Sequence, residues 1–123
     1  MSDTWETQPH ELDHVRADAF AERMFGVLND GALALLTSVG QRTGLFDVKA
    51  TLPPSTSQAL AGAASLNERY VREWLGAMVT GQIGAYDAAK GSYQLPPEHA
   101  ASLTRASTPN NTAACFQYIS LLG

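Results

Sequence analysis

The segment from His10 to His14, HELDH, holds residue types that could bind a metal ion. It matches H-E-x-x-H, in which two imidazoles on one face of a helix hold zinc and the glutamate acts as a general base. The context is poor for that chemistry, because the segment follows Pro9 directly, at the start of a predicted helix. A zinc protease also needs a third protein ligand, and His99 lies far along the chain. We therefore predict a solvated helix start and no metal site.

Two arginines, Arg69 and Arg72, lie on a predicted helix at the place where a DNA-reading protein would contact base edges. Glu68 and Glu73 lie beside them, so this helix is formally neutral. The predicted hairpin at 83–95 adds one acid and one base, and it is neutral as well. Phosphate contacts supply most of the non-specific affinity for DNA. Nucleic-acid binding therefore stays open but is not favoured, and we expect ion pairs within the helix.

No other part of the sequence carries a catalytic signature. There is no Ser/His/Asp or Cys/His order typical of nucleophilic catalysis. A phosphate-binding loop, a G-x-G-x-x-G after a strand and a βαβ alternation are also missing from the sequence. The single Cys115 excludes an internal disulfide and a multi-cysteine zinc site. We predict no catalytic, cofactor-binding or metal-binding residue in this chain.

Size and charge narrow the function classes further. The 123 residues, 45% of them hydrophobic, suit one folded domain. Residues 1–30 hold seven acids and two arginines, a net charge of −5, and the remainder has a net charge of +1, without the basic patch of a nucleic-acid binder. No apolar run reaches the ~18 residues that cross a membrane, and the acidic N-terminus is neither a signal nor a transit peptide. We expect a cytoplasmic protein that makes no membrane contact.

The N-terminal half predicts two helices after a flexible segment, residues 1–8. The first helix runs from Pro9 to Leu28, with a broad apolar stripe at helical spacing. The sequence NDG at 29–31 predicts a break, and a second helix follows at 32–43. Gly44 is placed to end that helix in the left-handed conformation, after which the chain returns to the core as far as residue 46.

The centre of the chain predicts a helix-turn-helix with a wing, over residues 56–95. Ser55 and Gln58 have the spacing of a capping box, and Asn67 suits the N-cap of a longer helix that ends at Gly81. The buried face of that helix is predicted at Tyr70, Val71, Trp74, Leu75, Met78 and Val79. Strands at 83–86 and 92–95 would place Tyr86 opposite Tyr93, as cross-strand partners.

Pro97 can open a short helix, and a last helix is predicted at 111–122. The predicted fold class is mainly α with a small β wing (α+β). It is a single winged helix-turn-helix domain over 9–123, with extra N-terminal helices at 9–46 and a C-terminal helix. A domain of this size has little room to bury all its apolar helices, and exposed apolar patches mark interfaces. We predict interface contacts at Phe20, Met24, Leu36, Phe116, Ile119 and Leu122.

Four segments taken in order resemble a known family: TSVGQRTGLFD, TSQALAGAASLNERYVREWLGAMVTG, YQLPPEHAASLT and FQYISLLG. They resemble the N-terminal region of bacterial class I S-adenosylmethionine-dependent methyltransferases that carry a winged-helix domain. The layout is also similar to the dimerisation domain of O-methyltransferases. The resemblance covers the chain from about Glu11 to Gly123.

The resemblance implies that this region packs against a C-terminal Rossmann-like domain, which binds the methyl donor, that it forms a homodimer, or that it does both. The glycine-rich donor-binding loop and the acidic residue after it have no counterparts in this sequence, so no cofactor residue is carried over. We expect an accessory and dimerisation domain that is not catalytic by itself. Methyltransferase activity and S-adenosylmethionine would belong to a parent enzyme. The chain would be a fragment, a truncated product or a stand-alone descendant. The alternative is a winged-helix transcriptional regulator that contacts DNA through Arg69 and Arg72.

Overall fold

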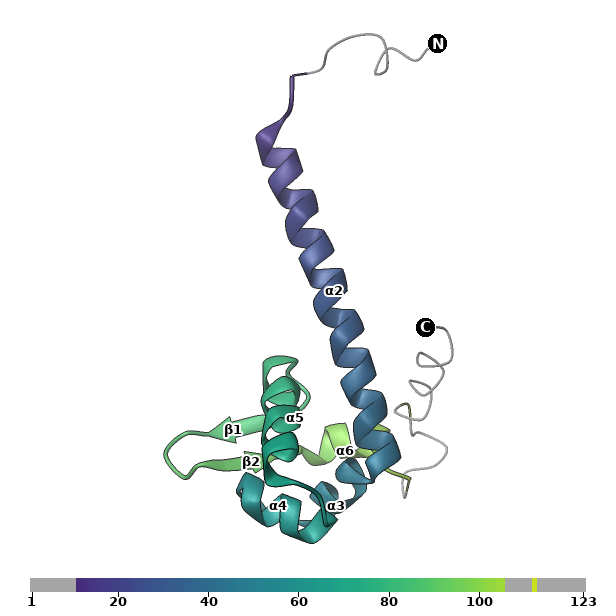
Figure 1. The fold of residues 1–123 in the computed structure, drawn as a ribbon, viewed down its shortest axis with the longest axis vertical. Coiled ribbons are helices and arrows are strands. Elements are labelled where there is room, and N and C mark those ends of the chain that lie inside the picture. The colour runs from purple at the N-terminus through teal and green to yellow at the C-terminus, as the bar shows by residue number, and fades with distance from the viewer. Residues whose placement is uncertain (1–10, 106–111, 113–123) are drawn as a thin grey trace. The chain divides into compact units, whose positions relative to one another are not determined.

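The computed structural model describes residues 11–105 and 112 of the chain. In order, the elements are α2 (His14–Thr43), α3 (Leu45–Thr51), α4 (Ser57–Ala64), α5 (Glu68–Thr80), β1 (Ala85–Asp87), β2 (Ser92–Gln94) and α6 (Pro97–Leu103) (Figure 1). The chain divides into two units, residues 1–30 and 31–123, and α2 contributes to both. The fold class is therefore mainly α with a small β wing, as the sequence predicts.

Helix α2 differs from the prediction at its start and in its middle. It begins at His14, because Asp13 caps it: the Asp13 Oδ1 accepts a hydrogen bond of 3.1 Å from the Arg16 backbone N–H. Residues 11–13 are not helical, so the prediction of a helix that starts at Pro9 and runs through them is wrong. The predicted break at 29–31 is also wrong, since α2 is continuous to Thr43. Glycine costs only about 1 kcal/mol inside a helix and Asn or Asp less, and no proline interrupts the hydrogen-bond ladder there.

The turn after α2 forms as predicted, and a helix that the sequence did not indicate follows it. Gly44 has φ 78° and ψ 10°, the left-handed conformation that favours glycine. Helix α3 then carries Leu45 and Phe46 into the core. Its seven residues are too few to show a helical period in the sequence.

The helix-turn-helix consists of α4 and α5. Asn67 caps α5 as predicted, its Oδ1 accepting from the Arg69 backbone N–H at 2.9 Å, and the helix ends at Gly81. The predicted cap of α4 is one residue off, because Thr56 Oγ1 accepts the capping hydrogen bond from the Ala59 N–H at 3.1 Å. The backbone of Ser55 is used elsewhere, in a bridge to the wing.

The wing is a two-stranded antiparallel hairpin, shorter than predicted. Tyr86 pairs with Tyr93, as predicted, and their ring centroids lie 4.7 Å apart. Ser55 adds a single antiparallel bridge to Tyr93, with N···O distances of 3.0 and 2.7 Å. Helix α6 opens at Pro97, as predicted. The predicted helix at 111–122 and the predicted flexible segment at 1–8 lie outside the described residues, apart from Thr112.

The core lies between the second half of α2 and helices α3 to α6. Its buried apolar residues are Leu45, Phe46, Leu60, Ala61, Val71, Trp74, Leu75, Met78 and Leu103. The prediction for α5 is confirmed at Val71, Trp74, Leu75 and Met78, whereas Val79 is only half-buried and Tyr70 is 70% exposed, since both lie at the edges of the buried face. Phe46 and Trp74 pack edge to face with centroids 5.1 Å apart, and Trp74 Nε1 donates to the Leu36 carbonyl at 2.9 Å.

Candidate functional site

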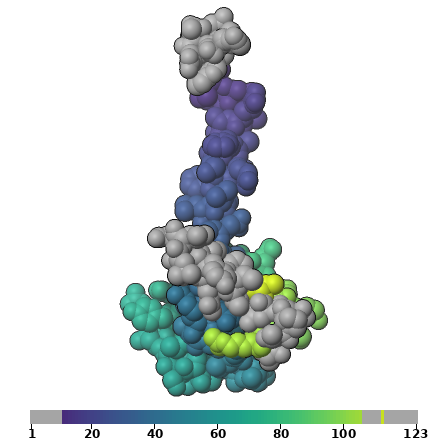
Figure 2. Space-filling model, turned by 90° about the vertical axis from the view of Figure 1, so that its right-hand side faces the viewer, coloured from purple at the N-terminus to yellow at the C-terminus, as the bar shows by residue number. Residues whose placement is uncertain are grey.

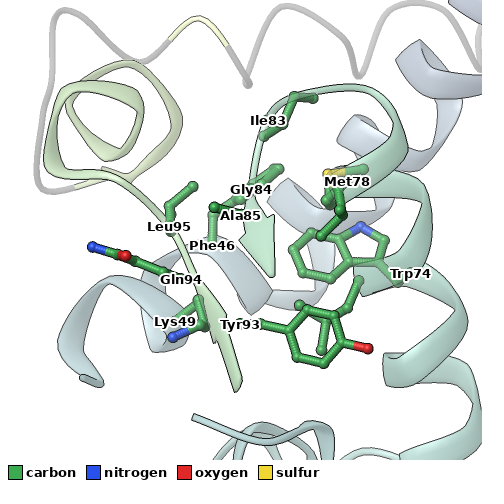
Figure 3. Close-up of a pocket in the computed structure, with 12 residues that line it drawn as sticks. Phe46, Lys49, Trp74, Met78, Ile83, Gly84, Ala85, Tyr93, Gln94 and Leu95 are labelled. Atoms are coloured by element: carbon green, nitrogen blue, oxygen red, sulfur yellow. The ribbon is translucent and has the colours of Figure 1, made fainter. Parts of the chain in front are cut away.

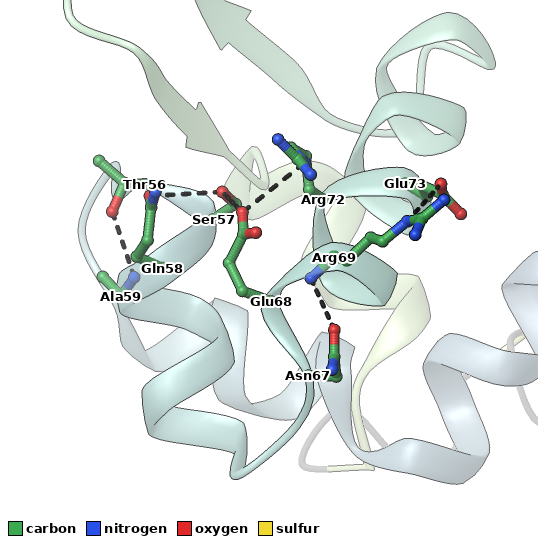
Figure 4. A network of polar contacts seen from close by, with 9 residues as sticks. All are labelled: Thr56, Ser57, Gln58, Ala59, Asn67, Glu68, Arg69, Arg72 and Glu73. Atoms are coloured by element: carbon green, nitrogen blue, oxygen red, sulfur yellow. Dashed lines mark hydrogen bonds and ion pairs between the residues drawn. The ribbon is translucent and has the colours of Figure 1, made fainter.

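The two arginines of α5 face acids of their own helix. Arg69 lies 3.7 Å from Glu73, and Arg72 lies 3.8 Å from Glu68, each pair four residues apart (Figure 4). Glu68 also accepts a hydrogen bond of 2.5 Å from the Ser57 hydroxyl of α4. The side chains of Arg69 and Arg72 are 76% and 59% exposed, so each pair is worth only about 0.3–0.5 kcal/mol. Both arginines are exposed, and their two charges are balanced by those of Glu68 and Glu73, so the helix surface is neutral.

The wing does not add the positive charge that DNA binding needs. Its loop holds Asp87, whose Oδ1 caps the turn by accepting from the Ala89 N–H at 3.0 Å, and Lys90, which is exposed. These two charges cancel, as they do on α5. The sequence prediction of ion pairs within the α5 helix is therefore confirmed, and DNA contact by Arg69 and Arg72 stays a prediction.

Most of the exposed large apolar side chains of the described residues lie on α2 or just before it. Phe20 is 65% exposed and Met24 is 46% exposed. Other large apolar side chains of residues 11–35 are also exposed: Leu12, Val15, Phe25, Val27, Leu28 and Leu35. Residues 11–30 appear in purple to blue in Figure 2. Ala21, Met24, Phe25 and Leu28 line a shallow, open hollow on this helix.

The six predicted interface residues fall into three groups. Phe20 and Met24 lie on the exposed apolar surface of α2. Leu36 packs against the core and is half-buried, because it lies beside the indole of Trp74, so it has less surface to offer a partner. Phe116, Ile119 and Leu122 lie outside the described residues. The interface itself stays a prediction.

A small cavity lies beneath the wing, between β2 and helices α3 and α5 (Figure 3). It has a volume of about 20 Å³ and an almost wholly apolar lining, which includes Phe46, Trp74, Met78 and Leu95. That volume suits about one water molecule, far less than a cofactor needs.

Lys49 borders this cavity and was not singled out from the sequence. Its side chain is 4% exposed, and its ammonium donates to the Pro53 carbonyl at 3.1 Å. Burial lowers the pKa of Lys49 below its ordinary value of 10.5, because the charged form loses hydration. In the sequence this residue sits between a core residue and a proline pair without any motif, so only its position in the fold reveals it.

The histidine motif does not have the helical geometry that zinc binding requires. Residues 11–13 are not helical, and His14 is the first residue of α2, so the helical spacing of H-E-x-x-H is not formed. His10 lies outside the described residues. His99 is engaged elsewhere, with Nδ1 at 2.7 Å from the Ile83 carbonyl oxygen.

Nor do the described residues fit S-adenosylmethionine as a nucleotide-like ligand. Such a site needs a parallel strand, a glycine-rich loop and a helix in succession. Within residues 11–105 the strands form an antiparallel hairpin, which is followed by proline and the short helix α6.

Across the same residues, none of the helices has the length and apolar character to cross a membrane.

Comparisons with known proteins agree with this architecture. A family model described as the Rv2258c-like winged HTH domain matches residues 31–105. No curated protein matches the chain. Three solved structures share the fold at 19% sequence identity.

The first of these structures is human N-acetylserotonin methyltransferase in complex with SAM, with a TM-score of 0.68 over 81% of this chain and 30% of that one. The mitomycin 7-O-methyltransferase MmcR has a TM-score of 0.70 over 85% of this chain and 30% of that one. The S-adenosylmethionine-dependent methyltransferase SibL in its apo form has a TM-score of 0.64 over 80% and 28%. The chain thus spans less than a third of the length of each. With most of its length matched by the family model, the chain belongs to the Rv2258c-like winged helix-turn-helix domains.

Proposed function

We propose that this chain is the accessory and association domain of an S-adenosylmethionine-dependent methyltransferase and is not catalytic by itself. Its partners would be a second copy of the chain, a catalytic methyltransferase domain, or both. The fold supports the proposal, because the methyltransferases that share it do so over 28–30% of their length. The remainder of such an enzyme would hold the donor and the acceptor.

The distribution of exposed surface carries the proposal. Helix α5 and the wing, which a DNA reader would use, are electrically neutral. Helix α2 exposes a run of large apolar side chains, and monomeric proteins rarely leave such a surface uncovered. An association domain needs an exposed apolar surface, and it does not need a positively charged helix α5 or wing.

The methyl donor would bind to the catalytic domain. The cavity beneath the wing has room for about one water, and the described strands form an antiparallel hairpin instead of the strand–loop–helix unit that would hold the adenosine or the sulfonium group. Titration of the purified chain with S-adenosylmethionine in a calorimeter should therefore give no binding heat. Binding with a dissociation constant in the micromolar range would contradict the assignment.

A DNA-binding test separates the proposal from its alternative, a transcriptional regulator. The exposed guanidinium groups of Arg69 and Arg72 favour that alternative. Fluorescence anisotropy with labelled duplexes at about 50 mM salt should show no specific binding, since few phosphates could be neutralised. Specific, salt-sensitive binding that disappears on Arg69→Ala with Arg72→Ala would establish the regulator instead. A Glu68→Ala, Glu73→Ala control, which unmasks both arginines, would show whether neutrality is what prevents binding.

A further inference from the structure

The outer strand of the wing has an open edge. Among the described residues β1 pairs with β2 on one side only, and all three residues of β1 are exposed (Figure 1). On the far side of β2, Ser55 and Tyr93 exchange two backbone hydrogen bonds of 3.0 and 2.7 Å. Strand β2 is therefore paired on both sides, and β1 is the strand to which a further strand could add.

The bridge from Ser55 fixes the direction of the Tyr86 backbone groups. The N–H and C=O of one strand residue point to the same side of the strand, and this side alternates along the strand. Because those of Tyr93 point to Ser55, Tyr86 and Tyr93 form a non-hydrogen-bonded pair within the hairpin. The N–H and C=O of Tyr86 therefore point outward, to the open edge of β1.

A hollow lies on one face of the wing, next to this edge. Its volume is about 290 Å³, and its lining residues are Pro54, Ala85, Tyr86, Asp87, Lys90, Ser92 and Gln94. The side chains of Ala85 and Asp87 face it together with those of their pairing partners on β2, because side chains alternate between the faces of a strand. Ser92 is only 9% exposed, yet its hydroxyl makes no hydrogen bond within the described residues. The hollow thus contains a hydroxyl group without a partner.

Asp87 gives this edge a negative charge. Its Oδ1 accepts from the Ala89 N–H, and no basic residue of the described chain forms an ion pair with it. A strand added beside β1 would place one of its residues directly opposite Asp87, at the short distance of a non-hydrogen-bonded pair. A basic side chain at that position would form a cross-strand ion pair.

We propose that the wing binds an extended segment of a partner protein, which adds antiparallel to β1. The segment residue opposite Tyr86 exchanges two backbone hydrogen bonds with it. The residue before it is basic and lies opposite Asp87, and the residue after it carries an amide that crosses Ala85 into the hollow. The small side chain of Ala85 leaves this path open. The inference goes beyond the proposed function, since it uses the wing and not helix α2.

A second copy of the wing fits this edge less well. In an antiparallel pair about a two-fold axis, Tyr86 would face Tyr86 of the partner subunit, and Asp87 would face Ala85 of the partner subunit. Asp87 would then gain no basic partner. The two Asp87 side chains would also lie on the same face of the joined sheet, where like charges oppose the pairing.

The first test uses the peptide acetyl-TKVQT-amide as the probe and follows the nitrogen-15-labelled chain by NMR. In the free chain the Tyr86 amide should exchange its hydrogen fast and the Tyr93 amide slowly, because only Tyr93 donates to a carbonyl. Peptide at up to about 5 mM, a range that suits so small a contact, should move the signals of residues 85–87, 92 and 94 and protect the Tyr86 amide. Slow exchange at Tyr86 in the free chain, or a peptide that moves none of these signals, would overturn the proposal.

Two altered peptides test the backbone contact and the direction of the segment. Methylation of the valine nitrogen should weaken binding about tenfold or more, since it removes one hydrogen bond and adds a steric clash. The peptide acetyl-TQVKT-amide has the same composition and charge, and it should bind about two- to fivefold more weakly because an amide replaces lysine opposite Asp87. Equal binding by all three peptides would show an adventitious contact and would refute the pairing.

Substitutions at Tyr86 test the contact from the side of the protein. Tyr86→Pro removes the outward N–H but no hydrogen bond of the hairpin, and proline is tolerated at such an edge position. Tyr86→Ala is the matched control, because it removes the ring and keeps the N–H. Slow exchange at Tyr93 in both variants would show that the wing is folded. Tyr86→Pro should lose much more affinity than Tyr86→Ala, and an equal loss would contradict backbone recognition.

The charge of Asp87 is tested without loss of its cap. Asp87→Asn keeps an oxygen that can accept from the Ala89 N–H, and it should weaken the lysine peptide about two- to fivefold at low salt. Lys90→Gln, in the same loop, should not weaken it. A larger loss from Lys90→Gln than from Asp87→Asn would mean that the segment is acidic at this position and would overturn the assignment.

The wing contact and the proposed function fail separately. Signals of Tyr86 that move with protein concentration in the absence of peptide would place a second copy at this edge and would overturn the partner segment. Specific DNA binding by the chain would overturn the accessory role, and peptide binding at β1 would remain.

Discussion

Replacement of the buried Lys49 by methionine should stabilise the domain. Methionine follows the lysine side chain to the Cε position, so it keeps the apolar contacts of a residue that is 4% exposed. It removes an ammonium group whose one hydrogen bond within the described residues goes to the Pro53 carbonyl. Pro53 is exposed, so water can reach that carbonyl in the variant.

Two opposing terms set the magnitude. The lost hydrogen bond from a charged donor is worth about 1.5–3 kcal/mol. The hydration that the charge loses on burial costs several kcal/mol in real proteins, and replacement of a buried ion pair by apolar residues of similar volume is often neutral or stabilising by about 1–4 kcal/mol. We expect a net gain of about 1 kcal/mol in the free energy of unfolding, which raises the melting temperature of a 123-residue chain by about 4 °C.

The pH dependence identifies the cause. The pKa of Lys49 is lowered in the folded state, so between that pKa and 10.5 the unfolded chain holds a proton that the folded chain has released. Stability of the wild type therefore rises with pH through that window. The advantage of Lys49→Met should be full below the window and should shrink as pH approaches 10.5. Thermal melts of both proteins from pH 7 to pH 10.5 measure this difference, in which other titrating groups cancel.

Lys90→Met is the matched control, because Lys90 is exposed on the wing loop. Its effect should stay within about 0.5 kcal/mol and should not depend on pH. If Lys49→Met destabilises the fold, or if its advantage is constant with pH, the unfavourable burial of this charge is not the correct explanation.

Two further predictions concern the packing at two glycines and the ion pair between Arg105 and Asp47. Gly40→Ala should lower the free energy of unfolding by about 1–3 kcal/mol in a denaturant titration, because its Cβ would lie 2.6 Å from the aromatic rings of Phe46 in α3 and Trp74 in α5. Gly76→Ala, on the open side of α5, should raise the free energy of unfolding by about 0.5–1 kcal/mol in the same titration. Arg105 donates to Asp47 from its backbone N–H at 2.8 Å and from Nη1 at 2.6 Å. A double-mutant cycle with Asp47→Ala and Arg105→Ala should give a coupling of about 1 kcal/mol at low salt that falls in about 1 M NaCl, and a salt-independent coupling would rule out the ionic contact.

Local chemistry made much of the fold readable from the sequence. Asn67 caps α5, Gly44 adopts the left-handed conformation and Pro97 opens α6, because each depends only on neighbouring backbone groups. The pairing of Tyr86 with Tyr93 follows from the turn between them and from alternation along the strands. Neutrality of α5 was equally visible, because Arg69 and Arg72 pair with acids one turn away on the same helix.

Contacts between distant segments decided the rest. Ser55 looked like a helix cap, but its backbone pairs with Tyr93, so the cap moved to Thr56. Lys49 gave no signal, because its burial depends on the wing that folds against α3. At residues 29–31 a continuous helix and a broken one differ by only about 1 kcal/mol in local helix propensity, so the sequence alone could not decide between them. Sequence patterns show which hydrogen bonds and contacts a residue can make with its neighbours along the chain. Only the tertiary structure shows which partners from distant segments it makes contact with instead.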